Sequence, residues 1–346
     1  DPQGNRMAAV VGHGVLDMWK ITDPNARIAA NTAGAKEVLE AALATNPRLV
    51  NTINTARQTD SHTPPPRLTH VSINLTSPDT LRSTWLGRAL NPDSTEKDYT
   101  RAQFAAFDAN SGPGQKLQLI GGEPVSVDVD TITFSFGINL AATNPLLSTL
   151  LMGVWNNVHA HNTVNMVKLI GDLGQGEFGA RGTPPGGFIG EVYDKAQAAG
   201  QTELLQKLRV QTDVVRELFT TNAFKEGRGD TAKMGREILV LQTLAEKTLD
   251  HIGATDMAAT MSKGCKSDKD RGGVMDVELK SKLILQGMGG DMAPDTRLVG
   301  DDQELYYAVS ASSGQLENQR WNTGLGGSKE TGHIKERLPD LQARQY

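Results

Sequence analysis

The segment Cys265-Lys266-Ser267-Asp268-Lys269-Asp270-Arg271 places an arginine six positions after a cysteine. A short apolar run, Met257 to Met261, leads through Gly264 into this segment, and apolar residues at helical spacing follow from Val274 to Gln286. The pattern therefore predicts a strand, a compact loop and a helix. Because a helix N-terminus presents unpaired N–H groups and a positive dipole end, this order favours a phosphate-binding loop.

The spacing of Cys265 and Arg271 is typical of cysteine-based phosphoryl chemistry. A thiolate is a strong nucleophile, and a helix N-terminus with cations nearby favours that form. The five residues between the two can wrap so that backbone N–H groups converge on the phosphoryl oxygens. Arg271 can hold two of those oxygens at once, which a lysine cannot do. Attack by sulfur gives a phosphocysteine that water later hydrolyses, so Cys265 is the predicted nucleophile and Arg271 the predicted phosphate clamp.

Further charged residues lie inside the same segment. Lys266 and Lys269 add two positive charges, more than a phosphotyrosine needs and suited to a substrate that carries several phosphates. The alternative for both lysines is a solvated surface position. Asp270 stands beside Arg271, where a carboxylic acid can protonate the leaving oxygen. A structural role for Asp270, as partner of an amide or a lysine, stays open at this point.

Composition limits the function classes. The chain has 346 residues, a mean hydropathy of -0.37 and a net charge of -5, which fits a globular protein and argues against a general nucleic-acid binder. No stretch approaches the ~18 apolar residues of a membrane span. The single cysteine excludes an internal disulfide and a cysteine-rich zinc site. His159 and His161 stand two positions apart on a helical segment, which is poor geometry for a shared metal.

The remaining pattern predicts an α/β fold with a central sheet, flanking helices and helical insertions between residues 146 and 249. Residues 1–115 are expected to form a subdomain or to pack against a phosphatase domain at 116–346, whose phosphate-binding loop lies at 265–271. The glycine-rich stretch 171–190 is expected to be a surface loop, with a lid as the alternative. Helices are expected at 32–54 with a break at Pro47, at 146–170, 204–218 and 234–244, and strands at 68–75, 117–120 and 125–136.

The loop segment resembles the Cys-Lys-Ser-x-Lys-Asp-Arg signature of the inositol polyphosphate 4-phosphatases. It is most similar to their bacterial type III secreted effector branch, the SopB/SigD/IpgD family. Weaker matches run from about Phe134 to the C-terminus. They are Phe134 to Asn139 with the family's Phe-Gly-Val-Asn motif, Gly229-Asp230 with Lys233-Met234, and Asn322 to Gly324 with Leu338-Pro339.

The resemblance implies a protein tyrosine phosphatase-like fold and a phosphatase without metal or cofactor. It implies dephosphorylation of phosphoinositide lipids or soluble inositol phosphates at host membranes by an effector that the bacterium secretes into the host cell. Cys265, Arg271 and Asp270 would be catalytic. Substrate contacts would come from the rest of the loop and its flank: Lys266, Ser267, Asp268, Lys269 and Gly272.

The sequence departs from this family at two positions. Asp268 stands where the family usually has a small residue, and a carboxylate there weakens anion binding if it points inward but is tolerated, or acts as the acid, if it points outward. Gly272 stands where the family typically has Thr or Ser, whose hydroxyl commonly stabilises the sulfur leaving group. Both positions bear on the turnover of the phosphocysteine.

Several functions remain open beside hydrolysis. The loop could bind phosphoinositide head groups with little turnover, or pass the phosphoryl group to another hydroxyl. The fold could instead serve as a scaffold that binds a host small GTPase. A protein phosphatase is a further alternative, which the paired lysines argue against.

Overall fold

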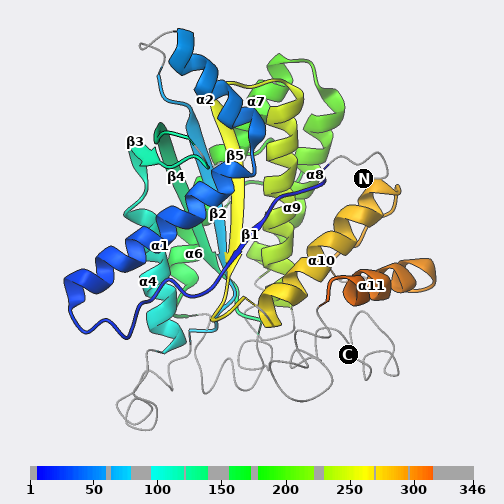
Figure 1. Cartoon of the computed structure of the whole chain (residues 1–346). Helices are drawn as coiled ribbons and strands as arrows, with labels where there is room; N and C mark the ends of the chain where they lie inside the picture. Colours follow the sequence, from blue (N-terminus) through cyan, green and yellow to red (C-terminus); the bar gives the residue numbers. More distant parts are fainter. Residues whose placement is uncertain are drawn as a thin grey trace.

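The computed structural model describes residues 6–59, 64–78, 95–120, 122–138, 156–172, 178–221, 230–268, 270–294 and 297–314. Within these residues one five-stranded sheet runs through the molecule in the order β1-β5-β2-β4-β3 (Figure 1). All neighbours are parallel except the edge pair β3 and β4. The strands are β1 (Val11–His13), β2 (Arg67–Asn74), β3 (Gly112–Leu117), β4 (Val125–Ser135) and β5 (Met257–Gly264).

The register of the central strands brings their carboxyl ends to one edge. Asn74 at the end of β2 is aligned with Ser135 of β4 on one side and Gly264 of β5 on the other. The segment that follows β5 therefore begins at the carboxyl edge of the sheet, the place where open α/β sheets bind their ligands.

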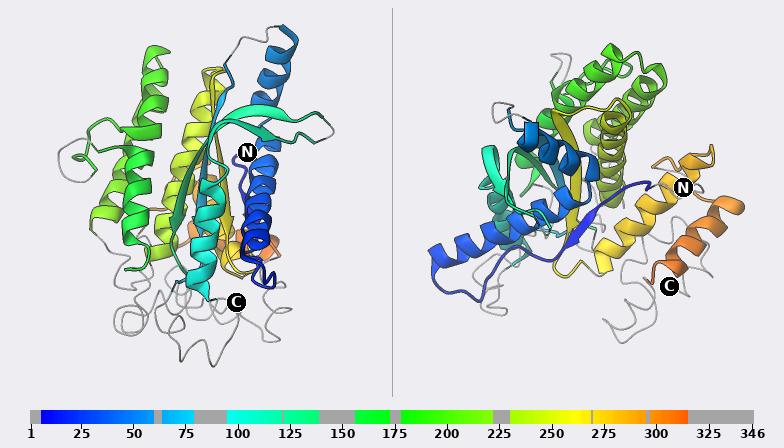
Figure 2. Two further views of the ribbon diagram at one scale, coloured as in Figure 1. Left: turned by 90° about the vertical axis from the view of Figure 1, so that its left-hand side faces the viewer. Right: turned by 45° about the horizontal axis from the view of Figure 1, so that its top comes forward.

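Helices cover both faces of the sheet (Figure 2). One face carries α1 (Pro24–Ala44), α2 (Pro47–Thr59) and α4 (Glu96–Asp108). The other carries α6 (His159–Ile170), α7 (Gly187–Ala198), α8 (Thr202–Thr220) and α9 (Asp230–His251). Next to α9 lies α10 (Asp270–Gly287), and α11 (Asp301–Ser312) packs against α10.

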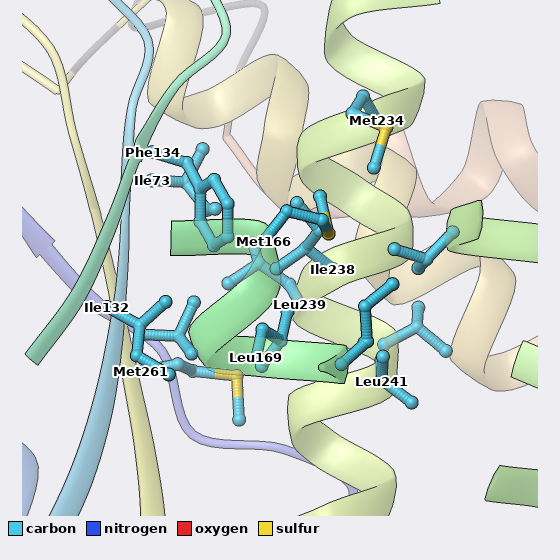
Figure 3. Packing of buried hydrophobic residues seen from close by; sticks show 14 of the residues in the cluster. Ile73, Ile132, Phe134, Met166, Leu169, Met234, Ile238, Leu239, Leu241 and Met261 are labelled. Atoms are coloured by element: carbon cyan, nitrogen blue, oxygen red, sulfur yellow. The ribbon is translucent and has the colours of Figure 1, made fainter. Parts of the chain in front are cut away.

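The larger core lies between the sheet and the α6–α9 layer. Ile73, Phe134 and Met261 project from three adjacent strands and meet Met166 of α6 and Ile238 of α9, and each of the five side chains is fully buried (Figure 3). Burial of one such side chain contributes about 1.5–3 kcal/mol. Because parallel strands are covered on both sides, β2 and β5 are buried along nearly their whole length.

Most of the predicted architecture is confirmed. The α/β class, the helical insertions, the strand before Cys265 and the helix after Arg271 are all present. Pro47 begins α2, so the predicted break separates two helices. Residues 1–115 supply β1 and β2 to the same sheet as β4 and β5, and the division of the chain near residue 115 stays a prediction.

The structure differs from the expected local structure at three places. The strand expected at 117–120 lies at Gly112–Leu117 instead. No helix was expected at 96–108, although Thr95 and Asp98 form the capping box of α4. The loop expected through residue 190 ends earlier, because α7 begins at Gly187.

Candidate active site

The segment from Cys265 connects β5 to the N-terminus of α10, as predicted. The carbonyl of Gly264 accepts a hydrogen bond of 2.7 Å from the N–H of Leu75, which ties the end of β5 to the chain after β2. The ring of His13 covers Gly264 so closely that a Cβ atom there would lie 2.3 Å from it. A side chain at residue 264 would therefore require the ring of His13 to move.

Cys265 is the only cysteine of the chain, and its side chain is buried at the start of the loop. The backbone N–H of Asp268 donates to its Sγ atom over 3.1 Å. This N–H comes from the loop that leads into α10. The strand before Cys265 and the helix after the loop are those that the sequence predicted, and the role of Cys265 as nucleophile stays a prediction.

Arg271 is held by a carboxylate that sequence analysis missed. Its Nη2 and Nη1 atoms donate to the two oxygens of Glu96 over 2.7 and 3.2 Å, and Nη1 also reaches the carbonyl of Leu75 at 3.3 Å. Glu96 is the first residue of α4, and its Oε2 atom accepts the N–H of Ser77 as well. This fork fixes the guanidinium on the carboxyl-edge side of β2. The capping box that begins α4 was the available signal.

The side chain of Asp268 points toward Lys263 of β5. Its carboxylate contacts the Nζ atom of Lys263 at 2.9 Å, while its backbone N–H faces Cys265. Burial, against the opposing effect of Lys263, raises the pKa of Asp268 to about 6. Lys263 lies on β5 and is itself only 2% exposed. No pattern in the sequence singled out Lys263, because a lysine inside a strand gives no sign of its partner.

The other predicted site residues are placed as follows. Lys266 is exposed, and its Nζ atom lies 6.0 Å from the ring centre of Tyr99. Ser267 is exposed, and Gly272 is buried in the first turn of α10. Lys269 lies outside the described residues. Asp270 begins α10, but its side chain is outside the description, so its role as acid stays a prediction.

In the ranges that the structure describes, no group of three or more His, Cys, Asp or Glu side chains is arranged to hold a metal ion. His161 instead stacks on Phe104 and contacts Thr133 at 2.8 Å. None of the described helices combines the length and apolar character that crossing a membrane requires.

Proteins named inositol phosphate phosphatases are similar to this chain along most of its length. The chain is 25% identical to the inositol phosphate phosphatase IpgD of Shigella flexneri, over 98% of this chain and 55% of that protein. It is 28% identical to the inositol phosphate phosphatase SopB of Salmonella typhi, over 96% and 52%. The chain thus spans about half the length of these relatives.

A solved structure shares the fold. The Legionella phosphoinositide phosphatase SidF superimposes with a TM-score of 0.50 and 15% identity, over 90% of this chain and 61% of that one. A family model described as enterobacterial virulence protein IpgD matches residues 1–341, well beyond the motifs that the sequence alone revealed. This chain therefore belongs to the IpgD family of enterobacterial virulence proteins.

Proposed function

We propose that this protein is a cysteine-based phosphatase that removes phosphate from phosphoinositides or inositol polyphosphates. The observation that carries the proposal is the convergence on one loop of the buried Cys265 thiol, the Asp268 N–H at 3.1 Å from its sulfur, and the Arg271 guanidinium fixed by Glu96. The relatives named inositol phosphate phosphatases support the substrate class.

The reaction follows from the positions of these groups. The sulfur of Cys265 attacks phosphorus in line with the ester oxygen, so that an S–P bond forms while the P–O bond to the inositol ring breaks. Arg271 and the loop N–H groups hold the equatorial oxygens as charge shifts in the transition state. The leaving oxygen takes a proton from an acid, for which Asp270 is the candidate. Water then attacks phosphorus and gives its proton to the same acid, now a carboxylate; the S–P bond breaks, phosphate is released and the thiolate is regenerated.

A substrate with several phosphates suits the surroundings of the loop. Lys266 is exposed at the loop beside Tyr99 and can reach a phosphate next to the one being transferred. Lys269 is proposed to contact a neighbouring phosphate in the same way. A phosphotyrosine offers no second phosphate for such lysines, so we expect inositol-based substrates to be preferred over phosphopeptides.

We extend the proposal to the setting of the reaction. The matching family is described as a virulence protein, which supports secretion by a bacterium into a host cell. There the protein would act on lipid head groups at the membrane surface or on soluble inositol phosphates in the cytosol. Binding to a host small GTPase is a separate hypothesis from the sequence, and a pull-down with GTPases that Cys265→Ser leaves unchanged would support it.

The test is phosphate release across a panel of phosphoinositides, soluble inositol phosphates and phosphopeptides. We expect release from the inositol compounds and at least a ~10³-fold loss in Cys265→Ser, with a similarly severe loss in Arg271→Lys because lysine cannot replace the fork. Glu203→Gln, an exposed change on α8, is the control and should leave the rate unchanged.

Two other outcomes would contradict hydrolysis. Head-group binding without released phosphate would favour a binding protein, and transfer of the phosphoryl group to an added alcohol in place of water would favour a phosphotransferase.

A further inference from the structure

Three residues from three elements fit around the carboxylate of Asp268 in the loop. The side chain of Asp268 extends between Gly12 of β1 and Gly272 of α10 and ends at Lys263 of β5. Its side chain is 13% exposed and that of Lys263 only 3%, so the pair is almost entirely removed from water. Breaking a charged pair at such a depth is costly, because it leaves a buried charge without its partner.

The space for this carboxylate exists only because residues 12 and 272 are glycines. A Cβ atom at Gly272 would lie 2.0 Å from Oδ1 of Asp268, and one at Gly12 would lie 2.2 Å from Oδ2. Both distances are far below van der Waals contact. A short side chain that is ion-paired to Lys263 cannot yield without breaking that pair. The two glycines and the carboxylate are therefore mutually dependent.

The backbone of Asp268 is fixed together with its side chain. Its φ of 52° lies in the left-handed region, where aspartate is tolerated but a β-branched residue is not. In this conformation the N–H of Asp268 points at the sulfur of Cys265 while the carboxylate points at Lys263. Side-chain position and N–H direction therefore change together.

Charged or titratable groups of β1, β5 and α10 lie near Asp268. Lys263 of β5 is the cation, and Asp276 of α10 lies 3.4 Å from the same Nζ atom on its other side. From β1, His13 lies near Lys263, and burial lowers the pKa of its ring to about 4, so it is neutral at pH 7. Among the residues that the structure describes, the buried Oδ1 atom of Asp268 has no hydrogen-bond partner. Burial of such an oxygen is costly, so stability alone does not explain its position.

We propose that Asp268 is a positioning residue for Cys265: its carboxylate, locked between Gly12, Gly272 and Lys263, holds the loop so that the Asp268 N–H meets the sulfur. Gly272 is the partner that this position requires, because any side chain there displaces the carboxylate. The expected effect on phosphate release rests on the proposed function, whereas the expected effect on the reactivity of the Cys265 sulfur does not.

Because Cys265 is the only cysteine, its alkylation by iodoacetamide reports on the loop without any need for turnover. We expect Gly272→Ser to slow alkylation at pH 7 by about tenfold, as a hydrogen bond to the charged sulfur is lost. Phosphate release should fall by about 10²-fold, the effect of a displacement near 1 Å. Asp268→Ala should show a smaller loss in both assays.

The decisive variant is the double change Asp268→Ala with Gly272→Ser. With the carboxylate gone, the Cβ atom of the serine meets the Nζ atom of Lys263 at 2.9 Å, and this is the far end of a flexible side chain that has lost its ion-pair partner Asp268 and can shift. Adding Gly272→Ser to Asp268→Ala should therefore cause no further loss. Gly12→Ala offers the same test from β1 and should likewise be rescued by Asp268→Ala. Additive losses in both double variants, or single variants that behave as wild type, would overturn the proposal. Rescue is the readout that a merely destabilising substitution would not give.

Controls separate this inference from folding and from the proposed function. Gly290→Ser adds a side chain where only ordinary contact awaits it, and Asp256→Asn removes an exposed partner of Lys195; both should alkylate as wild type. Far-UV circular dichroism and unfolding midpoints identify any variant that is not folded at the assay temperature. If the two substitutions have non-additive effects on the alkylation rate but the protein releases no phosphate, the proposed function alone is contradicted. If the protein releases phosphate but the effects on the alkylation rate are additive, this inference alone is contradicted.

Discussion

At the scale of single residues, the site contains two ion pairs, one of which holds Arg271 and the other Asp268. Glu96 holds the guanidinium of Arg271 at the open side of the loop, and Lys263 holds Asp268 beneath it. Cys265 and Arg271 were candidates from the sequence, because their spacing is typical of cysteine-based phosphoryl chemistry, and their catalytic roles stay predictions. Glu96 and Lys263 were not candidates, because they lie in other elements and act through the fold. The two departures at positions 268 and 272 belong to one structural feature.

The first residue-level prediction concerns Glu96. In Glu96→Gln the fork to Arg271 loses its charge, so we expect phosphate release to fall on the order of 10–10²-fold as the guanidinium loses its fixed position. The protein should stay folded, since the change keeps size and shape. Release assays on Glu96→Gln beside the exposed Glu203→Gln check this. Equal rates in both variants would show that Glu96 does not position Arg271.

The second concerns pH. Burial raises the pKa of Asp268 to about 6, above the value of an unfolded aspartate, so the folded state holds a proton more tightly between pH ~4 and ~6. The stabilisation of the folded state by this raised pKa of Asp268 is complete below pH ~4 and is lost as pH rises through ~6. Each pKa unit corresponds to about 1.4 kcal/mol. The free energy of unfolding of Asp268→Asn should therefore rise relative to that of wild type by up to ~3 kcal/mol between pH 4 and 7.

Denaturant unfolding of both proteins at pH 4, 5.5 and 7 measures that difference. Groups common to the two proteins cancel in the comparison, Glu246 with its raised pKa among them. A difference that stays constant across the series, or that changes in the opposite direction, would contradict the assignment.

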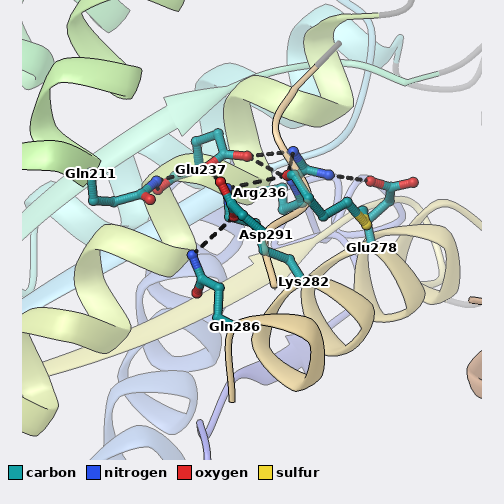
Figure 4. A network of polar contacts seen from close by, with 8 residues as sticks. Gln211, Arg236, Glu237, Glu278, Lys282, Gln286 and Asp291 are labelled. Atoms are coloured by element: carbon teal, nitrogen blue, oxygen red, sulfur yellow. Dashed lines mark hydrogen bonds and ion pairs between the residues drawn. The ribbon is translucent and has the colours of Figure 1, made fainter. Parts of the chain in front are cut away.

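At the scale of elements, α10 carries the loop at its N-terminus and is anchored along its length by buried charges (Figure 4). Arg236 of α9 pairs with Glu278 of α10 at 2.7 Å, and Lys282 pairs with Glu237 at 2.8 Å. From α11, the hydroxyl of Tyr306 donates to Glu278. Although burial opposes it, the charges of Glu237 and Glu278 raise the pKa of Arg236. The network fixes where α10 starts relative to β5.

We therefore expect Glu278→Ala to destabilise the protein by about 3–5 kcal/mol, because it leaves the fully buried Arg236 short of a partner. Unfolding by denaturant measures this, with the exposed Glu203→Ala as the matched control. A loss in Glu278→Ala no larger than in the control would show that the network does not secure α10.

At the scale of the whole molecule, the sequence allowed the α/β class and the strand–loop–helix unit to be predicted, since hydrophobic spacing reports on burial. It did not reveal β1, a strand of three residues that is too short to show a period. It also misplaced β3, an edge strand of mainly exposed residues with a register shift against β4. Such elements are determined by their partners in the sheet, which a local pattern does not contain.

The sheet order gives a prediction about the first 115 residues. β5, which leads into Cys265, lies between β1 and β2, and both come from that part of the chain. A protein that starts at residue 116 lacks both neighbours of β5 and should show neither cooperative unfolding nor phosphate release. Circular dichroism during denaturation checks this. A sharp transition in the fragment would instead support an independent domain at 116–346.

The central claim is that Cys265 carries the phosphoryl group during turnover. The most direct measurement is acid quench within milliseconds of mixing with an inositol polyphosphate, followed by mass spectrometry of the peptide that contains Cys265. We predict one added phosphoryl group on Cys265, which appears before free phosphate and is absent in Cys265→Ser. Phosphate release without a phosphorylated Cys265, or undiminished release by Cys265→Ser, would contradict the account.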